Sequence, residues 1–151
     1  MVIKTYIAAG FFNSFQNEAV DYLEKFLDED SRFKAFSPRR ETKLEGFEKP
    51  EVQKKVFNIN VDNVTSSDLV ICSTIDKDMG AIFEAAIAFD NKIPVIYTFF
   101  DERFKNSKFN LMLGQSGIAC FTDKAKFEEF MNKLTEENLS EIKQEYEGDF
   151  E

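Results

Sequence analysis

The chain has 151 residues, of which 43% are hydrophobic, and it carries a formal net charge of −9 at pH 7. This length suits one domain that buries roughly two thirds of its unfolded surface, and the acidic balance excludes nucleic acid and anionic membranes as partners, because both bind basic surfaces. Histidine is absent, which removes catalytic triads and the commonest zinc ligand, so we expect no metal and a small-molecule ligand.

The first predicted strand spans residues 2–9 and is followed by a helix. Asn13 starts this helix, with Gln16 three residues later as in a capping box, and apolar side chains continue at helical spacing to Phe26. A short second strand covers residues 33–36. The chain therefore begins with the strand–helix–strand order of an α/β fold.

The next segment, residues 39–49, is charged and precedes a proline, which indicates a loop long enough to act as a lid. Pro50 suits the first turn of a helix over residues 50–64. Helical spacing gives this helix an inner stripe of Val52, Val56, Ile59 or Asn60, and Val64. Asn60 is therefore predicted to point inward.

Two uninterrupted apolar runs, residues 68–73 and 93–98, predict buried strands. Residues 117–121 supply a fifth strand, and Asp123 begins a last helix that runs to Leu134. Such strands, alternating with helices, are typical of a parallel sheet covered on both faces.

This order predicts a single doubly wound α/β domain of flavodoxin or Rossmann type with a five-stranded parallel sheet. We expect the domain to occupy residues 1–134, with residues 135–151 as an acidic C-terminal extension. In such folds the ligand binds at the carboxyl ends of the strands.

The cysteines indicate in which cellular compartment the protein is expected, and the phenylalanines indicate whether it forms an oligomer. Cys72 and Cys120 each lie in a strand-like run, and two lone cysteines without a signal peptide predict reduced, buried thiols in the cytoplasm. Eighteen phenylalanines without a tryptophan give a small domain more aromatic area than its own core needs, so we expect a homo-oligomer.

Glu84 lies in the apolar run of residues 81–89, which has the pattern of a buried helix. A glutamate there is paired, protonated or lining a cavity, because burying a free carboxylate costs free energy. Functional sites are where proteins tolerate that cost. The alternative is that Glu84 faces water at one edge and that Asp78 is an ordinary helix N-cap. On spacing alone the two interpretations carry similar weight.

A functional interpretation places Asp78 and Glu84 at one crevice, where two carboxylates suit glycoside-type chemistry. Gly80 between them would let a sugar approach the backbone closely, although helix-start geometry explains it equally well. Tyr6, near the end of the first strand, has the chemistry to donate a hydrogen bond that keeps Glu84 ionised and aimed, although a tyrosine in such a place is more often only a strand residue.

Nucleotide cofactors are not expected. The segment Ala8-Ala9-Gly10 lacks the G-x-G-x-x-G fingerprint, and no P-loop lysine follows it. Arg39 and Arg40 have the chemistry to bind a phosphate, but a charged pair in a loop is more often solvated surface, and we favour that interpretation.

Taken together, five short motifs over residues 3–121 resemble the nucleoside 2-deoxyribosyltransferase family. They are Tyr6-Ile-Ala-Ala-Gly10-Phe11-Phe12, Phe36-Ser-Pro38-Arg39, Asp68-Leu-Val-Ile, Asp78-x-Gly80-x-x-x-Glu84 and Asn110-Leu-Met112. Each motif is weak, but their order and spacing make the resemblance specific.

The resemblance implies a role for each matching residue. It makes Glu84 the nucleophile, Asp78 the group that holds the deoxyribose hydroxyls, and Tyr6 the residue that orients the nucleophile. It also implies that a neighbouring subunit supplies Asn110 and Met112 to the site, in an obligate oligomer that is typically a hexamer built from dimers.

Further substrate contacts are expected from Gly10, Phe11 and Gly80, with Phe11 near the sugar. The sequence departs from the family pattern at Asn60, where many relatives carry an aspartate that helps to protonate the leaving base. An amide can bind a base but cannot act as a general acid, and helical spacing turns the nearby Asp62 away. Base preference is left open by this substitution.

We therefore expect an enzyme that exchanges the base of a 2′-deoxyribonucleoside through a covalent deoxyribosyl-glutamate. The first alternative is an N-hydrolase of 2′-deoxynucleoside 5′-monophosphates, in which Arg39 or Arg40 would bind the phosphate. The second alternative is a nucleotide-sensing module on the same scaffold that binds its ligand without turnover.

Overall fold

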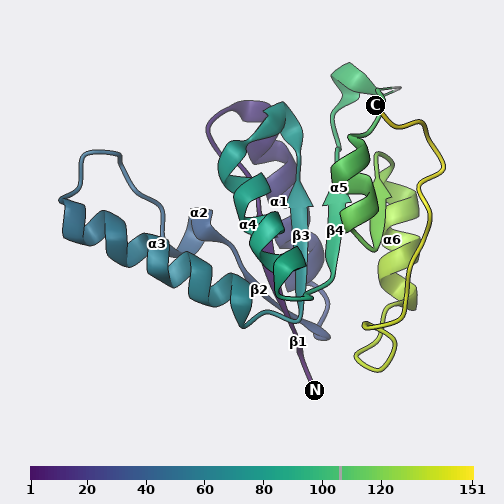
Figure 1. Cartoon of the computed structure of the whole chain (residues 1–151), viewed down its shortest axis with the longest axis horizontal. Coiled ribbons are helices and arrows are strands. Elements are labelled where there is room, and N and C mark those ends of the chain that lie inside the picture. The colour runs from purple at the N-terminus through teal and green to yellow at the C-terminus, as the bar shows by residue number, and fades with distance from the viewer. Residues whose placement is uncertain (106) are drawn as a thin grey trace.

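Apolar strands alternate with helices, and in the computed structural model, which describes residues 1–105 and 107–151, the strands form one parallel sheet with the order β2-β1-β3-β4-β5 (Figure 1). The strands are β1 (Ile3–Ala8), β2 (Phe33–Phe36), β3 (Leu69–Ser73), β4 (Val95–Thr98) and β5 (Ala119–Phe121). The predicted doubly wound α/β class is confirmed. All five carboxyl ends consequently lie at one edge of the sheet.

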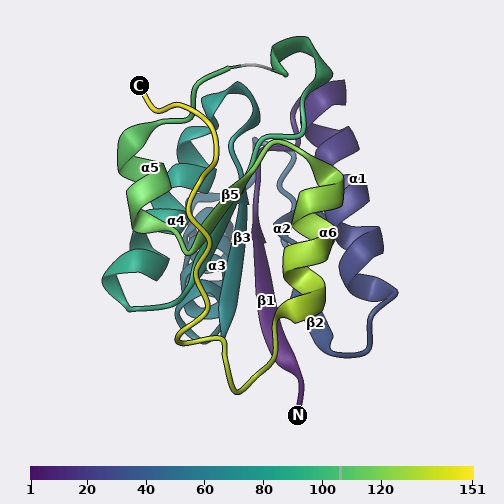
Figure 2. The ribbon, with the colours of Figure 1, turned by 90° about the vertical axis from the view of Figure 1, so that its right-hand side faces the viewer.

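Helices cover both faces of the sheet, with α1 and α6 on one face and α4 and α5 on the other (Figure 2). The helices are α1 (Ser14–Asp28), α2 (Pro38–Glu41), α3 (Pro50–Thr65), α4 (Met79–Asp90), α5 (Leu111–Ser116) and α6 (Lys124–Lys133), with 3-10 turns η1 (Ile75–Lys77) and η2 (Glu102–Phe104). Among the described residues, no helix is both long enough and apolar enough to cross a membrane.

Four of the helices begin at a polar N-cap residue. Asn13, Asp78, Asn110 and Asp123 each accept a hydrogen bond from the backbone N–H three residues further on. Such caps satisfy one of the free N–H groups that every helix start exposes. The predicted starts at Asn13 and Asp123 are confirmed, and Asp78 is the helix N-cap that one of the two interpretations gave it.

Side chains of each strand alternate between two hydrophobic clusters. Ile3 and Ile7 of β1 face the cluster under α1 and α6, whereas Tyr6 and Ala8 belong to the cluster with α4. This alternation is the ordinary period of a strand. It directs Tyr6 toward the helix that carries Glu84.

The segment predicted as a loop, residues 39–49, begins with the short helix α2 instead. Pro38 stands at its first position, where the fixed φ of proline favours a helical turn. Arg39 and Arg40 form ion pairs with carboxylates of α1, which holds the turn in place. Local sequence does not predict such ion pairs, because the partners lie on another helix.

The inner stripe predicted for residues 50–64 is only partly correct. Val64 is fully buried, but Val52 remains 41% exposed, and Val56 and Asn60 are half-buried. The reason is that α3 projects sideways from the body of the molecule and packs chiefly along α4 (Figure 1). Periodicity identifies the apolar face of a helix, but not whether the same chain covers it.

The helix α4 is likewise less enclosed than predicted. A stripe of Ala81, Ala85 and Ala88 is buried against the sheet, while Phe83 and Phe89 are 54% and 58% exposed. A single chain therefore leaves large aromatic side chains of α4 uncovered.

Candidate active site

Tyr6 and Glu84 form the centre of the candidate site. Tyr6 is fully buried on β1, and its hydroxyl donates a hydrogen bond to Glu84 Oε2 on α4. The ring of Phe36, from β2, stacks on Tyr6 with centroids 5.5 Å apart. The predicted contact between Tyr6 and Glu84 is therefore present, and Phe36 fixes the Tyr6 ring.

The surroundings of Glu84 raise its pKa to about 7, mainly through burial and also through the negative charge of Asp78. The hydrogen bond from Tyr6 acts in the opposite direction and lowers the pKa of Glu84. Burial and the charge of Glu84 raise the pKa of Tyr6 well above its ordinary value, so the phenol stays protonated as a donor. A carboxylate with such a pKa is a candidate for a functional role.

Asp78 caps α4, because its Oδ2 accepts a hydrogen bond of 2.8 Å from the backbone N–H of Ala81. The cap interpretation of Asp78 is thus correct, and it also fixes the carboxylate one and a half turns before Glu84. Gly80 lies exposed in the first turn, where an added Cβ would stand 3.3 Å from Asp78 Oδ2.

Gly10 is buried beside Asp78, and the protein itself fills the space next to it. An added Cβ at Gly10 would overlap the Gln16 side chain and lie 2.9 Å from Asp78 Oδ1. The Gln16 side chain is buried, accepts from Phe12 N at 2.9 Å and donates to Ile75 O at 3.3 Å. Sequence reasoning identified Gln16 only as a cap residue, whereas it joins the loop after β1 to the loop after β3.

The turn before Asp78 is strained, because Asp76 and Lys77 have φ values of 58° and 53°. Neither is glycine, so this left-handed backbone costs energy that its neighbours must offset. Asp76 accepts hydrogen bonds from Asn13 at 2.7 Å and from Arg103 at 3.3 Å, and the guanidinium of Arg103 lies 3.4 Å from the ring centroid of Phe15. These contacts join three loops at the strand ends, and no local motif predicted them.

Two further predicted residues have contacts of their own. Asn60 accepts a hydrogen bond of 2.7 Å from the Thr42 hydroxyl, which orients its amide. Phe11 is half-buried and packs on Phe12, with ring centroids 4.9 Å apart. Their contacts with substrate remain predictions.

Arg39 and Arg40 are both engaged by acidic side chains of α1. Arg39 contacts Asp21 at 2.7 Å and Glu24 at 2.6 Å, and Arg40 contacts Asp28 at 2.7 Å. A phosphate group would have to compete with these carboxylates for either guanidinium.

Asn110 and Met112 lie apart from Glu84 within one chain. They line a cavity of about 880 Å³ together with Asp76 and Lys77 of the turn before Asp78, and neither Glu84 nor Tyr6 is among its lining residues. Met112 is 76% exposed. The described contacts connect Tyr6 with Glu84 and Asp78 with Gly10 and Gly80, and none of them includes Asn110 or Met112.

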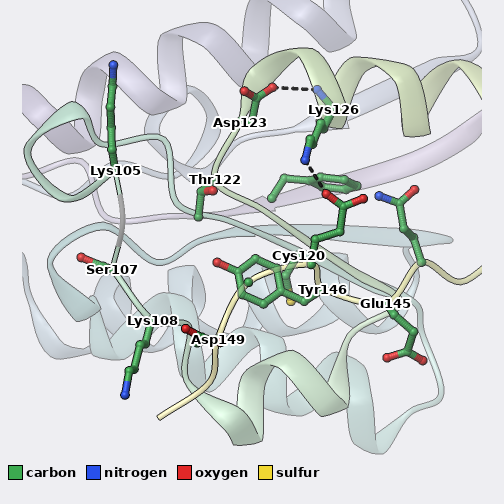
Figure 3. A pocket seen from close by; sticks show the side chains of 14 residues that line it. Lys105, Ser107, Lys108, Cys120, Thr122, Asp123, Lys126, Glu145, Tyr146 and Asp149 are labelled. Atoms are coloured by element: carbon green, nitrogen blue, oxygen red, sulfur yellow. Dashed lines mark hydrogen bonds and ion pairs between the residues drawn. The ribbon is translucent and has the colours of Figure 1, made fainter.

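A second cavity, of about 530 Å³, lies beside β5 and the start of α6 (Figure 3). Lys126 forms an ion pair with Glu147 there, and Asp123 caps α6. None of the predicted site residues lines it. Over the described part of the chain, no three His, Cys, Asp or Glu side chains gather as a metal site would require.

Comparisons with known proteins connect this geometry to a family. The model of the nucleoside 2-deoxyribosyltransferase family matches residues 5–140. A 2-deoxyribosyltransferase from Bacillus psychrosaccharolyticus is 25% identical, with a TM-score of 0.74 over 95% of this chain and 99% of that one. No curated protein sequence matches the chain.

More distant structures share the fold. A 2-desoxiribosyltransferase from Leishmania mexicana has 19% identity and a TM-score of 0.62, over 88% of this chain and 99% of that one. A CMP N-glycosidase from Clostridium botulinum has 10% identity and a TM-score of 0.56, over 85% of this chain and 98% of that one.

Proposed function

The chain belongs to the nucleoside 2-deoxyribosyltransferase family, and on that premise we propose that it exchanges the base of a 2′-deoxyribonucleoside by a double displacement. The observation that carries the proposal is the hydrogen bond from the buried Tyr6 to the half-buried Glu84, because it provides an aimed carboxylate beside a neutral donor. Its substrates are 2′-deoxyribonucleosides and free nucleobases, and the reaction as written needs no cofactor.

In the first step Glu84 attacks C1′ of the deoxyribose. The bond from C1′ to the base nitrogen breaks, its electron pair leaves with the base, and the base acquires a proton. The sugar is then held as an ester of Glu84. A nitrogen of a second base attacks C1′ and releases the carboxylate, and the proton that this base loses balances the proton that the first base gained. Two inversions give overall retention.

The protonation state of Glu84 follows from two opposing effects. Burial favours the neutral acid, which cannot attack, and raises the pKa of the carboxyl to about 7. The hydrogen bond from Tyr6 stabilises the carboxylate and restores part of the ionised population. Tyr6 thus orients the nucleophile and keeps it reactive near neutral pH.

Asp78 is proposed to hold the deoxyribose hydroxyls. One of its oxygens, Oδ2, is bound by the backbone of α4, and this fixes the direction of the other. Gly10, Phe11 and Gly80 border the same region as substrate contacts, and Asn60 is proposed to bind the base.

The proposed enzyme is a homo-oligomer, a hexamer built from dimers, in which Asn110 and Met112 reach the site of a neighbouring subunit. Uncovered aromatic side chains support this assembly. Phe57 of α3 and Phe83 of α4 are each 54% exposed, and their rings lie 6.3 Å apart on one surface. Apolar surface of this kind is typical of subunit contacts. The free, buried thiols of Cys72 and Cys120 fit the cytoplasm that we propose as its compartment.

The test is base exchange, followed by chromatography. The protein is incubated with deoxyinosine or deoxyadenosine, with and without an excess of a different base. We expect the new nucleoside to exceed free deoxyribose when the acceptor is present. Free sugar as the main product would favour a hydrolase, and no release of base from either donor would favour a binding module.

An N-hydrolase of 2′-deoxynucleoside 5′-monophosphates is the second candidate. The similarity to the fold of the CMP N-glycosidase supports it, because that fold accommodates cleavage of a base–sugar bond. The ion pairs of Arg39 and Arg40 with α1 weigh against it, since they occupy the cations proposed to bind phosphate. Comparing base release from a nucleoside and from its monophosphate separates the two candidates.

A further inference from the structure

Residues 149–151, which we call the C-terminal strap, run parallel to residues 109–111. The backbone N–H of Phe109 donates to Asp149 O at 2.9 Å, and Glu151 N donates to Phe109 O at 2.9 Å. Leu111 N donates to Glu151 O at 3.0 Å. The strap therefore binds the backbone immediately before and after Asn110.

Aromatic packing fixes the strap to the body of the protein. The Phe150 ring occupies the space beside Gly114 on α5, where an added Cβ would overlap it. Ring centroids are 5.4 Å apart for Tyr146 and Phe150, and 5.6 Å apart for Phe109 and Tyr146. Phe109 in turn lies 6.2 Å from the buried Tyr97 of β4. A continuous series of rings thus connects the strap to the sheet.

The segment that carries Asn110 and Met112 is held partly by the sheet, because Leu113 packs against the cluster of Tyr97 and the Ser116 hydroxyl lies 2.8 Å from the Tyr97 hydroxyl. The helix α5 has only six residues and contains a glycine, so its own tendency to form a helix is weak. Asn110 caps it, with Leu113 N donating to Asn110 Oδ1 at 3.2 Å. Met112 is largely exposed. Packing by Phe150 and hydrogen bonds to the strap hold the N-terminal part of this segment, where Asn110 and Met112 lie, in addition to these contacts.

We propose that the C-terminal strap is a positioning element, and Phe150 a positioning residue, that sets Asn110 and Met112 for use in a neighbouring subunit's site. This inference rests on the proposed function. It assigns the strap to the chain that supplies Asn110, not to the chain that supplies Glu84. A substitution in the strap should therefore be complemented by the same partner chain as a substitution of Asn110.

The test is complementation between inactive chains. Phe150→Ala alone should lower base exchange about tenfold or more, because Asn110 loses its fixed geometry. In a dimer of a Phe150→Ala chain with a Glu84→Ala chain, one site combines an intact Glu84 with an intact strap and Asn110. Random co-assembly of equal amounts should thus restore about a quarter of the wild-type sites. If Phe150→Ala only destabilised its own chain, the Glu84→Ala partner would not restore base exchange.

Mixing Glu84→Ala with Asn110→Ala is the reference. If that pair recovers activity and the Phe150→Ala pair does not, the strap inference is wrong while the shared site stands. If neither pair recovers although mixed dimers form, the proposed sharing of sites is wrong, and the inference falls with it. Wild-type activity in Phe150→Ala alone would also overturn the role of the strap.

Hydrogen exchange provides a readout that does not depend on activity. In Phe150→Ala we expect faster exchange of the Phe109 and Leu111 amides, whose acceptors lie in the strap. The matched control is Phe26→Ala, which removes a half-buried ring that packs on Phe127 under the opposite face of the sheet. It should leave those two amides unchanged. Unchanged exchange in Phe150→Ala would show that the strap does not hold this segment.

Discussion

The hydroxyl of Tyr6 and the carboxylate of Glu84, 78 residues apart in the chain, meet in a hydrogen bond between β1 and α4. The contact exists because Tyr6 stands on the strand face that α4 covers, while Glu84 lies beside the alanine stripe of that helix. It joins the two residues on which the proposed chemistry depends.

The first prediction concerns Glu84 as nucleophile. Glu84→Ala should lower the rate of base exchange by about three orders of magnitude or more, because it removes the covalent route. Circular dichroism should show that the fold is intact. The control is Asp90→Ala, which removes an exposed carboxylate from the last turn of the same helix. Retention of a tenth of the wild-type rate in Glu84→Ala would rule out this role.

The second prediction concerns pH. Since Glu84 must be ionised to attack and its pKa is raised to about 7, kcat/KM should rise with pH through about 7 and then level off. Tyr6→Phe removes the hydrogen bond that lowers this pKa, so the rise should move to higher pH. Tyr22→Phe is the matched control, because it removes a phenol that donates to Glu128 on α6. If Tyr6→Phe and Tyr22→Phe give the same pH profile, Tyr6 does not tune the nucleophile.

The third prediction concerns stability. The folded protein holds the Glu84 proton more tightly than the unfolded chain does, so the charge of Glu84 costs stability above the unfolded pKa, and this cost grows up to the folded pKa near 7. Glu84→Gln should therefore stabilise the protein at pH 8, by at most about 3 kcal/mol. Near pH 4 the difference should largely disappear, because the wild-type carboxyl is then neutral in both states. Urea unfolding at both pH values measures it, and equal effects at pH 4 and pH 8 would contradict the burial of the charge.

The fourth prediction concerns Asn60. Asn60→Asp introduces a group that can titrate beside the leaving base, so the ranking of donor bases or the pH profile of base release should change. The measurement is the rate of base release from a purine and a pyrimidine deoxynucleoside between pH 5 and pH 8. Asp62→Asn is the control, since Asp62 lies exposed on the other side of α3. An unchanged ranking and profile in Asn60→Asp would remove Asn60 from the site.

Local sequence predicted the sheet, its parallel direction and the helix starts, because strand composition and N-caps act within a few residues. The contact between Tyr6 and Glu84 was an expectation that rested on the family resemblance. The roles of Gln16 and Arg103 could not be predicted in this way. Their partners lie on loops that only the folded sheet brings together.

Exposure was the property that sequence predicted least well. Phe83 and Phe89 belong to a run that reads as buried, yet a single chain leaves them uncovered. Hydrophobicity reports that a side chain avoids water, and it does not distinguish the core of one chain from a contact between chains. For the same reason the half-buried position of Asn60 could not be predicted from helical spacing.

Gly10 has a backbone that any residue could adopt, since its φ is not positive, and what forbids a larger residue is the space taken by Gln16 and Asp78. The size of the side chain that position 10 can accept therefore depends on these two neighbours. Among related sequences, replacement of Gly10 should coincide with a shorter side chain at the position of Gln16. Such paired change would trace the contact through evolution, and Gly10→Ala should be tolerated better in a Gln16→Ala background than alone.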